Sequence, residues 1–587
     1  MSWIDWAVFV GFLGYVVVDG VRRGRGTTTL EGYFAGGRSI SWWAAGLSIM
    51  ATQASAITVI GTTGQGFESG MEFVQIYFGL AFAMVLLSIF FVPMYRAQPI
   101  LTAYEFLERR FGPLTRLLAA LIFLLSRCLA FGVVLYAPGV VMSALLGFNV
   151  AATVIVIGVL TTVYTMFGGV KAVIATDVKQ MVVILGGLGL ILVLLIMKVV
   201  PELGFVGGLE VLGVTGKLNA VEFEPASWDL IPKGVSDPGA SFWDDKYNFW
   251  SGMFGGLFLM LSYFGCDQSQ VQRILTNASP GDSRKALLMS AFAKVPMQAG
   301  VLFIGVLLYL FYVLNPAPLL FNEQAAAAVV DRPAIAAQMG DIERRYADAL
   351  ARRKSLAIKI AGQGVAAAAS SDVDGYREAA RDARQLRAEA RRTIKLSEPS
   401  SLALSPEDRA ELKTPGDTNF IFPRFILSEV PVVFLGLMMA AIFAAMMSSA
   451  DSALNSLTSS SIVDIYKRWL RPHATQAQSL LASRLMTLFW GLSATGAALM
   501  FQGSGSVIEV VNRVGSFFYG SLLGVFVLGL LVPRAGPLSG FLGLLGGMTA
   551  VLVTWQTLSV QFLWFNVIGC VGVLVVGGLT AIFERAR

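Results

Sequence analysis

The sequence predicts an all-α membrane protein with about 13 transmembrane helices. Of its 587 residues, 55% are hydrophobic and 14% are charged, whereas nearer a quarter of the residues in a soluble protein are charged. Uncharged runs of roughly 20 residues, each long enough to cross a bilayer, recur along nearly the whole chain. Spans this numerous must be helical, because lipid offers no water to the backbone N–H and C=O groups. The formal net charge of +6 is typical of a membrane protein with basic cytoplasmic loops and does not indicate a nucleic-acid partner.

Residues 1–40 are expected to form one extra N-terminal transmembrane helix and a cytoplasmic loop. The apolar run at residues 4–21 is followed by Arg22, Arg23 and Arg25. Basic residues concentrate on the cytoplasmic side of a membrane, so the N-terminus is expected outside. An odd number of spans then places the basic C-terminal sequence FERAR inside. The expected location is the cell membrane, as a multi-pass protein of a bacterial inner membrane.

A first group of five spans is expected within residues 41–200. Its first span begins near Trp42 and contains the sequence MATQASAITVIGTTGQG, which is too rich in small and polar residues for a continuous lipid-facing helix. A helix interrupted within the membrane, between Ala51 and Gly66, fits this composition better. The other spans are expected at residues 71–95, 116–146, 150–168 and 180–200. Asp177 is expected to open the last of these helices, either as a simple N-cap residue or as part of a site.

A second group of five spans is expected within residues 246–532, after an extracellular loop at residues 201–245. Its first span ends in the polar stretch Ser262–Gln272, next to Arg273 at a cytoplasmic exit. Residues 317–425 interrupt this group with a charged insertion dense in Ala, Glu and Arg, which predicts two helices that can pair as an antiparallel hairpin. The span count places the insertion outside, and long loops translocate regardless of charge. Residues 533–587 add C-terminal transmembrane helices.

The stretch from Pro431 to Asp464 carries the strongest local indication of a site. Its first half has the composition of a membrane helix, yet Asp451 and Asp464 lie within the stretch. A charged side chain at membrane depth costs at least ~2.5 kcal/mol, so it marks a functional site by default. Helical spacing places several small residues on one face, namely Ala445, Ser448, Ser449 and Ser452. Hydroxyl oxygens beside a negative charge suit a small hard cation, whereas serines that bond back to carbonyls of their own helix are the simpler alternative.

Two groups of five spans that each begin with an interrupted helix are typical of an inverted repeat. With these features the chain resembles the sodium:solute symporter family, whose core is of the LeuT type. The residues that carry the resemblance are WWAAGLSIMATQASAITVIG, TAYEFLERRFG, YTMFGGVKAVIATDVKQ, DQSQVQR and AAMMSSADSALNSLTSSSIVDIY. The resemblance covers nearly all of the chain except the 317–425 insertion, and it looks nearest to the branch of monocarboxylate, vitamin and iodide carriers. It implies a five-plus-five inverted repeat with interrupted first helices.

The resemblance also implies a sodium site between the first interrupted helix and the serine-rich helix. The positions that match its ligands are Ala51, Ala54 and Ala445 through backbone carbonyls, and Ser448 and Ser449 through hydroxyls. Alanine at the carbonyl positions removes no sodium ligand, since main-chain oxygens bind the ion there. A second sodium site, found in some members, would map to Asp177, Ser448, Asp451 and Ser452. Asp451 is equally open to a salt bridge, for example with Lys171 or Lys179.

In this family the substrate lies beside the interrupted helices, and the matching candidates here are Gln53, Ser55, Thr58, Gln75 and Tyr263. Tyr263 matches an aromatic gate of sugar-transporting relatives, with an ordinary interfacial tyrosine as the alternative. Those relatives have a glutamine and a glutamate where this chain has Thr58 and Tyr77. A sugar needs several convergent polar side chains, because unpaired polar groups in a buried site cost ~1–3 kcal/mol each. This sparser pocket favours a small organic anion such as a monocarboxylate, held partly by sodium and a helix N-terminus.

The function that follows is a sodium-coupled symporter that imports a small organic solute by alternating access, with Na⁺ as the coupling ion and no other cofactor. Sugars and amino acids are alternative substrates. A proton-coupled carrier using Asp177 or Asp451 and a transporter-like membrane sensor are the alternative functions. The sequence contains no nucleophile–base pair, phosphate loop or metal-ligand cluster, so an enzyme is not expected. Nothing in the sequence sets an oligomeric state.

Overall fold

A computed structural model describes residues 2–24, 28–147, 149–234, 241–322, 333–396, 417–501 and 507–584. Helices make up nearly all of the regular structure in these ranges, together with two isolated bridges. Nine of the described helices are long and apolar enough to cross a membrane. The expected all-helical membrane fold is confirmed at this level. Arg25, the last residues of FERAR and parts of the 317–425 insertion lie outside the described residues.

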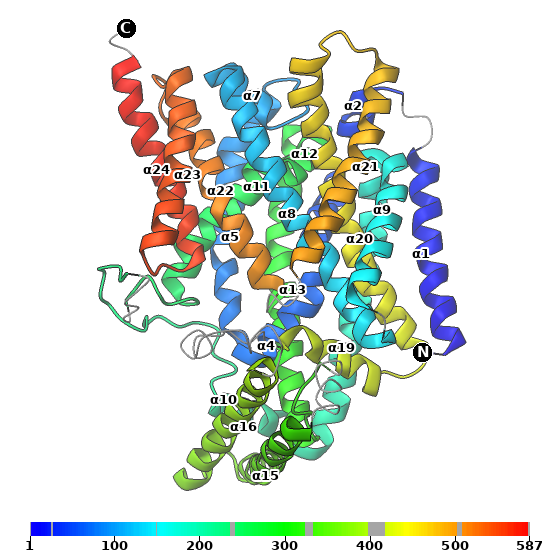
Figure 1. Ribbon diagram of the computed structural model, residues 1–587, viewed down its shortest axis with the longest axis vertical. Helices are drawn as coiled ribbons and strands as arrows, with labels where there is room; N and C mark the ends of the chain where they lie inside the picture. The colour runs from blue at the N-terminus through cyan, green and yellow to red at the C-terminus, as the bar shows by residue number, and fades with distance from the viewer. Residues whose placement is uncertain are drawn as a thin grey trace.

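Most helices run along the long axis of the molecule, and Figure 1 shows that α1 begins at one end of this bundle whereas α24 ends at the other. The longer helices of the bundle are α1 (Trp3–Gly24), α8 (Pro113–Leu146), α9 (Val150–Leu203), α13 (Pro280–Leu314), α20 (Phe434–Ser460), α21 (Gln476–Met500), α22 (Val507–Leu531), α23 (Pro537–Thr557) and α24 (Phe562–Glu584). Shorter elements connect them, including α2 (Leu30–Ala35), α5 (Phe78–Leu86), α6 (Val92–Arg96), α7 (Tyr104–Phe111), α10 (Phe205–Val214) and α19 (Thr418–Glu429).

The first expected interruption lies at Ala54 and Ser55. Helix α3 (Trp42–Gln53) ends there, because Ala54 has a non-helical backbone with φ −81° and ψ 61°. The chain resumes with a π-helical turn (Thr58–Thr62) and helix α4 (Thr63–Ser69). Such turns are frequent at functional sites. The interruption deprives carbonyls in the last turn of α3 of their intrahelical partners, so those oxygens can bind other groups.

The second expected interruption lies at Asp267. Helices α11 (Gly256–Cys266) and α12 (Gln268–Thr276) meet at this residue, whose backbone is extended with φ −78° and ψ 120°. The Asp267 carboxylate accepts a hydrogen bond of 2.8 Å from the backbone N–H of Ser269 and thereby caps α12. Both interruptions that the sequence predicts are therefore present in the structure.

The two interrupted helices run antiparallel to each other. The backbone N–H of Ile40, just before α3, donates to the carbonyl of Thr276 at the end of α12 over 3.2 Å. At the opposite end, the Gln75 amide donates to the carbonyl of Tyr247 over 3.0 Å. In Figure 1, α12 lies toward the end of the bundle where α24 ends, and α4 lies toward the other end. This is the relation that an inverted repeat requires.

Helix α20 passes through the centre of the protein, and a π-helical segment (Ser461–Leu470) continues it. All residues from 438 to 464 are buried, and α20 packs against α9, α8, α3 and α1. The serines and aspartates of this stretch therefore face protein rather than lipid. That burial removes the apparent conflict between their polarity and their membrane depth.

Helix α9 consists of two halves that meet at Gly169. Gly169 has a positive φ of 67°, and a Cβ atom there would lie 3.1 Å from the Tyr33 ring, so the turn requires glycine. The second half begins directly after this turn, well before the expected start at residue 180. Asp177 lies about two turns inside that half, so the interpretation of Asp177 as an N-cap residue is wrong.

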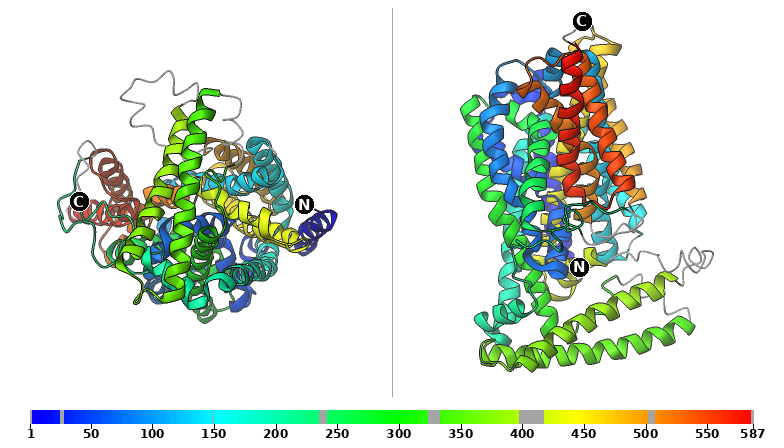
Figure 2. Two further views of the ribbon diagram at one scale, coloured as in Figure 1. Left: turned by 90° about the horizontal axis from the view of Figure 1, so that it is seen from below. Right: turned by 90° about the vertical axis from the view of Figure 1, so that its left-hand side faces the viewer.

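The 317–425 insertion contains the two expected helices, α15 (Pro333–Gln363) and α16 (Ser370–Leu396), which pack side by side as an antiparallel hairpin. Figure 2 shows that the hairpin projects sideways across the end of the bundle where α1 begins. Arg387 of α16 holds it there, because its guanidinium pairs with Asp417 at 2.8 Å and lies 4.7 Å from the centre of the Phe321 ring. Arg353 of α15 donates to the carbonyl of Tyr312 over 2.6 Å.

Lys217, in the loop after α10, makes a pH-dependent contribution to stability. Its ammonium donates to the carbonyl of Phe67 over 2.7 Å, and burial lowers the pKa of Lys217 to about 8. Between pH 8 and the unfolded value near 10.5 the unfolded chain binds the extra proton, so stability rises with pH. From pH 7.5 to 9.5 we expect the free energy of unfolding of the wild type to gain about 2 kcal/mol relative to Lys217→Met. Thermal unfolding in detergent checks this, and parallel pH responses of the two proteins would contradict it.

Candidate ion and substrate site

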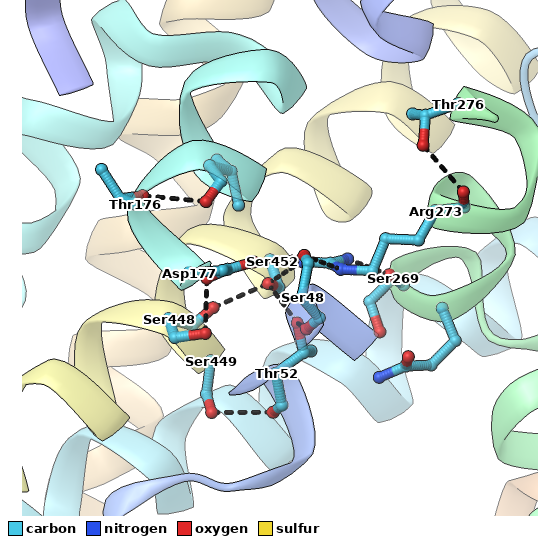
Figure 3. A network of polar contacts seen from close by, with 12 residues as sticks. Ser48, Thr52, Thr176, Asp177, Ser269, Arg273, Thr276, Ser448, Ser449 and Ser452 are labelled. Atoms are coloured by element: carbon cyan, nitrogen blue, oxygen red, sulfur yellow. Dashed lines mark hydrogen bonds and ion pairs between the residues drawn. The ribbon is translucent and has the colours of Figure 1, made fainter. Parts of the chain in front are cut away.

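The predicted sodium ligands lie on two facing elements. The end of α3 and its interruption carry Ala51 and Ala54, and α20 carries Ala445, Ser448 and Ser449, all of them buried. The elements touch where the Ser449 hydroxyl donates to the carbonyl of Thr52 over 2.8 Å (Figure 3). The structure thus brings the interrupted helix and the serine face of α20 together, as the sequence analysis expects.

The serine hydroxyls of α20 bond to oxygen atoms on more than one helix. Ser449 also donates to the carbonyl of Ala445 over 3.2 Å, and Ser452 donates to the carbonyl of Ser448 over 2.6 Å. These two bonds match the simpler alternative of serines bonding within their own helix. Ser448 differs, because its hydroxyl donates to the Asp177 carboxylate of α9 over 2.5 Å. A hydroxyl that donates its hydrogen keeps lone pairs that a cation can use.

Asp177 lies at the centre of a buried polar network that joins α3, α9, α12 and α20 (Figure 3). Its carboxylate accepts hydrogen bonds from Ser48 and Ser448 and lies 3.3 Å from a terminal guanidinium nitrogen of Arg273. Arg273 also donates to Ser48 over 2.8 Å and to Ser452. Only 1% of the Arg273 side chain is exposed. Arg273 therefore lies inside the protein rather than in an exposed loop at the expected exit, and it supplies a positive charge among the residues proposed for a second sodium.

Asp451 of α20 contacts the first half of α9, whereas Asp177 belongs to the second half of α9. The Asp451 carboxylate accepts a hydrogen bond of 2.6 Å from Thr165. Lys179, one of the two lysines suggested as its partner, instead forms a 2.6 Å ion pair with Asp19 of α1. Asp177 and Ser452 are thus brought together around Arg273, whereas Asp451 bonds to a residue outside that network.

A cavity of about 100 Å³ lies between the interrupted helices. Four of the five expected substrate residues line it: Gln53, Ser55, Thr58 and Tyr263. Thr52 and Ser449 line it as well, so the candidate sodium site adjoins the cavity. Tyr263 is therefore a cavity residue and not an interfacial tyrosine.

Gln75 is the exception among the expected substrate residues. It does not belong to the cavity lining, and its fully buried amide is already bonded to backbone groups. The amide nitrogen donates to the carbonyls of Glu72 and Tyr247, and the amide oxygen accepts from the N–H of Glu222 over 3.0 Å. Gln75 therefore anchors the loop before α11 and lies outside the lining of the cavity.

Arg127 of α8 is a cavity residue that the sequence analysis does not name. Its guanidinium lies 2.5 Å from the Asp267 carboxylate and 5.5 Å from the centre of the Tyr263 ring. Tyr519 of α22, also in the lining, donates to the same carboxylate over 3.2 Å. The signal for Arg127 was available, since a single arginine in the apolar run LIFLLSRCLAFG is an ionisable residue within a membrane span.

The arrangement can be compared with known proteins. The model of the sodium:solute symporter family matches residues 33–338 and 401–547, which is more than half of the chain. A sodium/sialic acid symporter of Proteus mirabilis (strain HI4320) is 25% identical, over 100% of this chain and 96% of its own length. A sodium-dependent multivitamin transporter of Oryctolagus cuniculus is 26% identical, over 94% of this chain and 70% of its own length.

A solved structure of a Na⁺-coupled sialic acid symporter, in a substrate-bound outward-open state, has the same fold. Its TM-score is 0.73 at 24% sequence identity, with 99% of this chain and 98% of that chain covered. The relatives are sodium-coupled membrane transporters rather than enzymes, with Na⁺ as their coupling ion. The resemblance drawn from the sequence is thereby confirmed. The chain belongs to the sodium:solute symporter family and is a multi-pass membrane transporter coupled to sodium.

Proposed function

We propose that this chain imports a small organic anion together with Na⁺ by alternating access. The observation that carries the proposal is Arg127, a buried cation in the wall of the cavity between the interrupted helices. Charge at membrane depth is costly and marks a functional group. A guanidinium there suits a carboxylate, which it can bind through two parallel N–H donors.

The hydrogen bonds of Arg127 leave donors for a ligand. A guanidinium has five N–H groups, and the bonds to Asp267 and Ser269 use a single terminal nitrogen. Its Nε is buried without a hydrogen-bond partner among the described residues. An unpaired buried donor costs about 1–3 kcal/mol, and an oxygen of a bound anion would remove that cost.

Apolar side chains in the rest of the lining suit the organic part of such an anion. They are Phe131 and Val134, one and two turns along α8 from Arg127, Leu259 of α11, and Ile508 and Val511 of α22. One cationic group in a lining with several apolar side chains favours a compact carboxylate over a sugar, whose many hydroxyls would lack partners. The sodium/sialic acid symporter supports the carboxylate part of this proposal alone, because sialic acid carries a carboxylate on a polyhydroxylated sugar.

Sodium would bind between the interruption of α3 and α20, held by the carbonyls of Ala51, Ala54 and Ala445 and the hydroxyls of Ser448 and Ser449. Because Thr52 and Ser449 also line the cavity, an ion there fixes α3 against α20 and shapes the substrate wall. Sodium couples to transport only if it binds one conformation better than the other. Each sodium that enters down 100 mV contributes ~2.3 kcal/mol.

The proposed topology has 13 spans, ten of them in a five-plus-five inverted repeat, with the N-terminus outside and the C-terminus inside. In this scheme each half of α9 is one crossing. Each interrupted helix, α3 with α4 and α11 with α12, is also one crossing. Residues 1–40 and 533–587 are additions to the two repeats at 41–200 and 246–532, with the loop at 201–245 and the hairpin of the 317–425 insertion outside. Arg22, Arg23, Arg284 and Lys285 lie at the end that this topology makes cytoplasmic, as the concentration of basic residues on that side requires.

Uptake into vesicles that contain the purified protein tests this function. Radiolabelled monocarboxylates, a sugar and an amino acid are compared in sodium and in choline, with an imposed membrane potential. We expect sodium-dependent accumulation of at least one carboxylate and none of the sugar. Accumulation of the sugar alone, or uptake that choline supports equally well, would overturn the proposal.

The sodium site has its own prediction. Replacing both Ser448 and Ser449 by alanine is expected to weaken sodium binding at least about tenfold, since two oxygen ligands are lost. Ser456→Ala is the matched control, because Ser456 lies on the same helix and, within the described ranges, its hydroxyl bonds only to the carbonyl of Ala453, over 2.8 Å. The readout is the sodium concentration that gives half-maximal thermal stabilisation. An unchanged value in the double variant would remove the site assignment.

A further inference from the structure

A second cavity lies between α1, α3 and the second half of α9, away from the substrate site. Its volume is about 530 Å³. Three basic side chains line it, Arg23 from α1 and Lys171 and Lys179 from α9, together with Ser41 and Trp43 at the start of α3. None of these residues lines the central cavity, and the proposed transport function leaves their convergence unexplained.

The charges around this cavity do not balance. Asp19 is shared by two of the cations, because Arg23 lies 2.9 Å and Lys179 2.6 Å from the same carboxylate oxygen. The third cation, Lys171, is exposed, and the described residues offer it no hydrogen bond or ion pair. The Ser41 hydroxyl likewise makes no capping bond to α3. Three cations with one carboxylate among them leave an excess of positive charge, which calls for an anionic ligand.

The surroundings of the cavity are those of a membrane interface. Trp42 and Trp43 beside it are 38% and 48% exposed, and tryptophan concentrates at the level of the lipid headgroups. Further along α1 and α9, toward the middle of the bundle, Tyr15, Val18 and Val182 are 54%, 56% and 67% exposed. The basic end of the site therefore adjoins apolar side chains that face lipid. Basic pockets between helices on the cytoplasmic side are typical binding places for anionic lipid headgroups.

We propose that this cavity binds the phosphate-bearing headgroup of an anionic phospholipid. Lys171 and Lys179 would contact the phosphate, and the acyl chains would lie along the exposed apolar side chains of α1 and α9. A soluble phosphate would gain nothing from that apolar surface. The bound lipid would join α1, α3 and α9. Two of these helices carry Ser48 and Asp177, which are hydrogen-bonded to each other in the polar network below the cavity.

Native mass spectrometry of the full chain in an uncharged detergent tests the site without any transport measurement, so its outcome is independent of the proposed function. Phosphatidylglycerol and phosphatidylcholine are titrated separately. We expect phosphatidylglycerol to bind at least about tenfold more tightly. The variant Lys171→Gln/Lys179→Gln should lose that preference. Lys285→Gln is the matched control, since Lys285 is an exposed lysine at the same end of the bundle outside the cavity, and it should keep the preference.

Two further arms make the result decisive. Lys171→Gln alone removes a side chain that has no hydrogen bond or ion pair to the part of the chain that the structure describes. It should therefore fold normally, which its unfolding midpoint in lipid-free detergent checks, and still weaken phosphatidylglycerol binding severalfold. Inorganic phosphate and glycerol 3-phosphate serve as competitors and are expected not to displace the lipid. Displacement by inorganic phosphate at equal concentration would assign the cavity to a soluble anion and overturn the proposal. Equal binding of both lipids, or variants that bind phosphatidylglycerol as the wild type does, would overturn it as well.

Discussion

Replacing Arg127 by glutamine is expected to lower the sodium-dependent uptake of the transported anion at least about 100-fold at low substrate concentration. A hydrogen bond to a charged group contributes about 1.5–3 kcal/mol, and two such bonds between guanidinium and carboxylate would be lost. A loss of about 3 kcal/mol corresponds to this factor. Arg127→Lys should recover only part of the rate, because lysine keeps the charge but not the paired donors.

The same substitution also removes the partner of Asp267, so stability and recognition must be separated. A buried carboxylate without its cation costs about 3–5 kcal/mol, which would destabilise Arg127→Gln on its own. The double variant Arg127→Gln/Asp267→Asn removes both charges and should unfold near the wild-type temperature. If Arg127 binds the anion, that stable double variant still fails to transport it. Normal carboxylate uptake with an unchanged KM by the double variant would show that the cavity arginine does not contact substrate.

The interruptions and the serine face of α20 could be predicted from the sequence because their signals are local. Small and hydroxyl residues gather around Ala54, and Ser448, Ser449 and Ser452 recur at helical spacing. A membrane span of this composition cannot face lipid as a continuous helix. The positions that matter on these two elements are therefore visible before any packing is known.

The contacts of Gln75, Asp177 and Arg273 could not be predicted in the same way, because they depend on which helices meet. Gln75 matches a substrate position of the family by sequence, yet both the nitrogen and the oxygen of its amide are hydrogen-bonded to the backbone of the loop before α11. The sequence places Asp177 near the start of a helix. The helix in fact begins earlier, after the turn at Gly169, and the close approach of Gly169 to Tyr33 that requires this glycine is not visible in the sequence. Arg273 looked like a loop residue, but the break at Asp267 starts α12 deep in the protein, so Arg273 reaches Ser48 and Ser452.

The Arg273–Asp177 pair leads to the second large expected effect, which concerns the number of sodium ions. In the wild type the guanidinium supplies the positive charge that Asp177 needs, so we expect only the site at Ser448 and Ser449 to respond to sodium. Arg273→Met leaves the Asp177 carboxylate buried without a cation, which should cost about 3–5 kcal/mol of stability in choline. The matched variant Arg273→Met/Asp177→Asn has no charge to compensate and should regain most of that loss.

Sodium should restore the stability of Arg273→Met but have no such added effect on Arg273→Met/Asp177→Asn. Without the guanidinium, the oxygens of Ser48, Asp177 and Ser452 lose their bonds to Arg273. Together with Ser448, which donates to Asp177, they would then bind a small hard cation. Binding to the folded state stabilises it by mass action, so the unfolding temperature of Arg273→Met should rise more steeply with sodium than that of the wild type. The unfolding temperature of the double variant should rise with sodium as that of the wild type does, because the double variant lacks the Asp177 carboxylate. A single variant that is as stable as the wild type in choline would mean that Arg273 does not neutralise Asp177, and the carboxylate would then be open to a second sodium in the native protein.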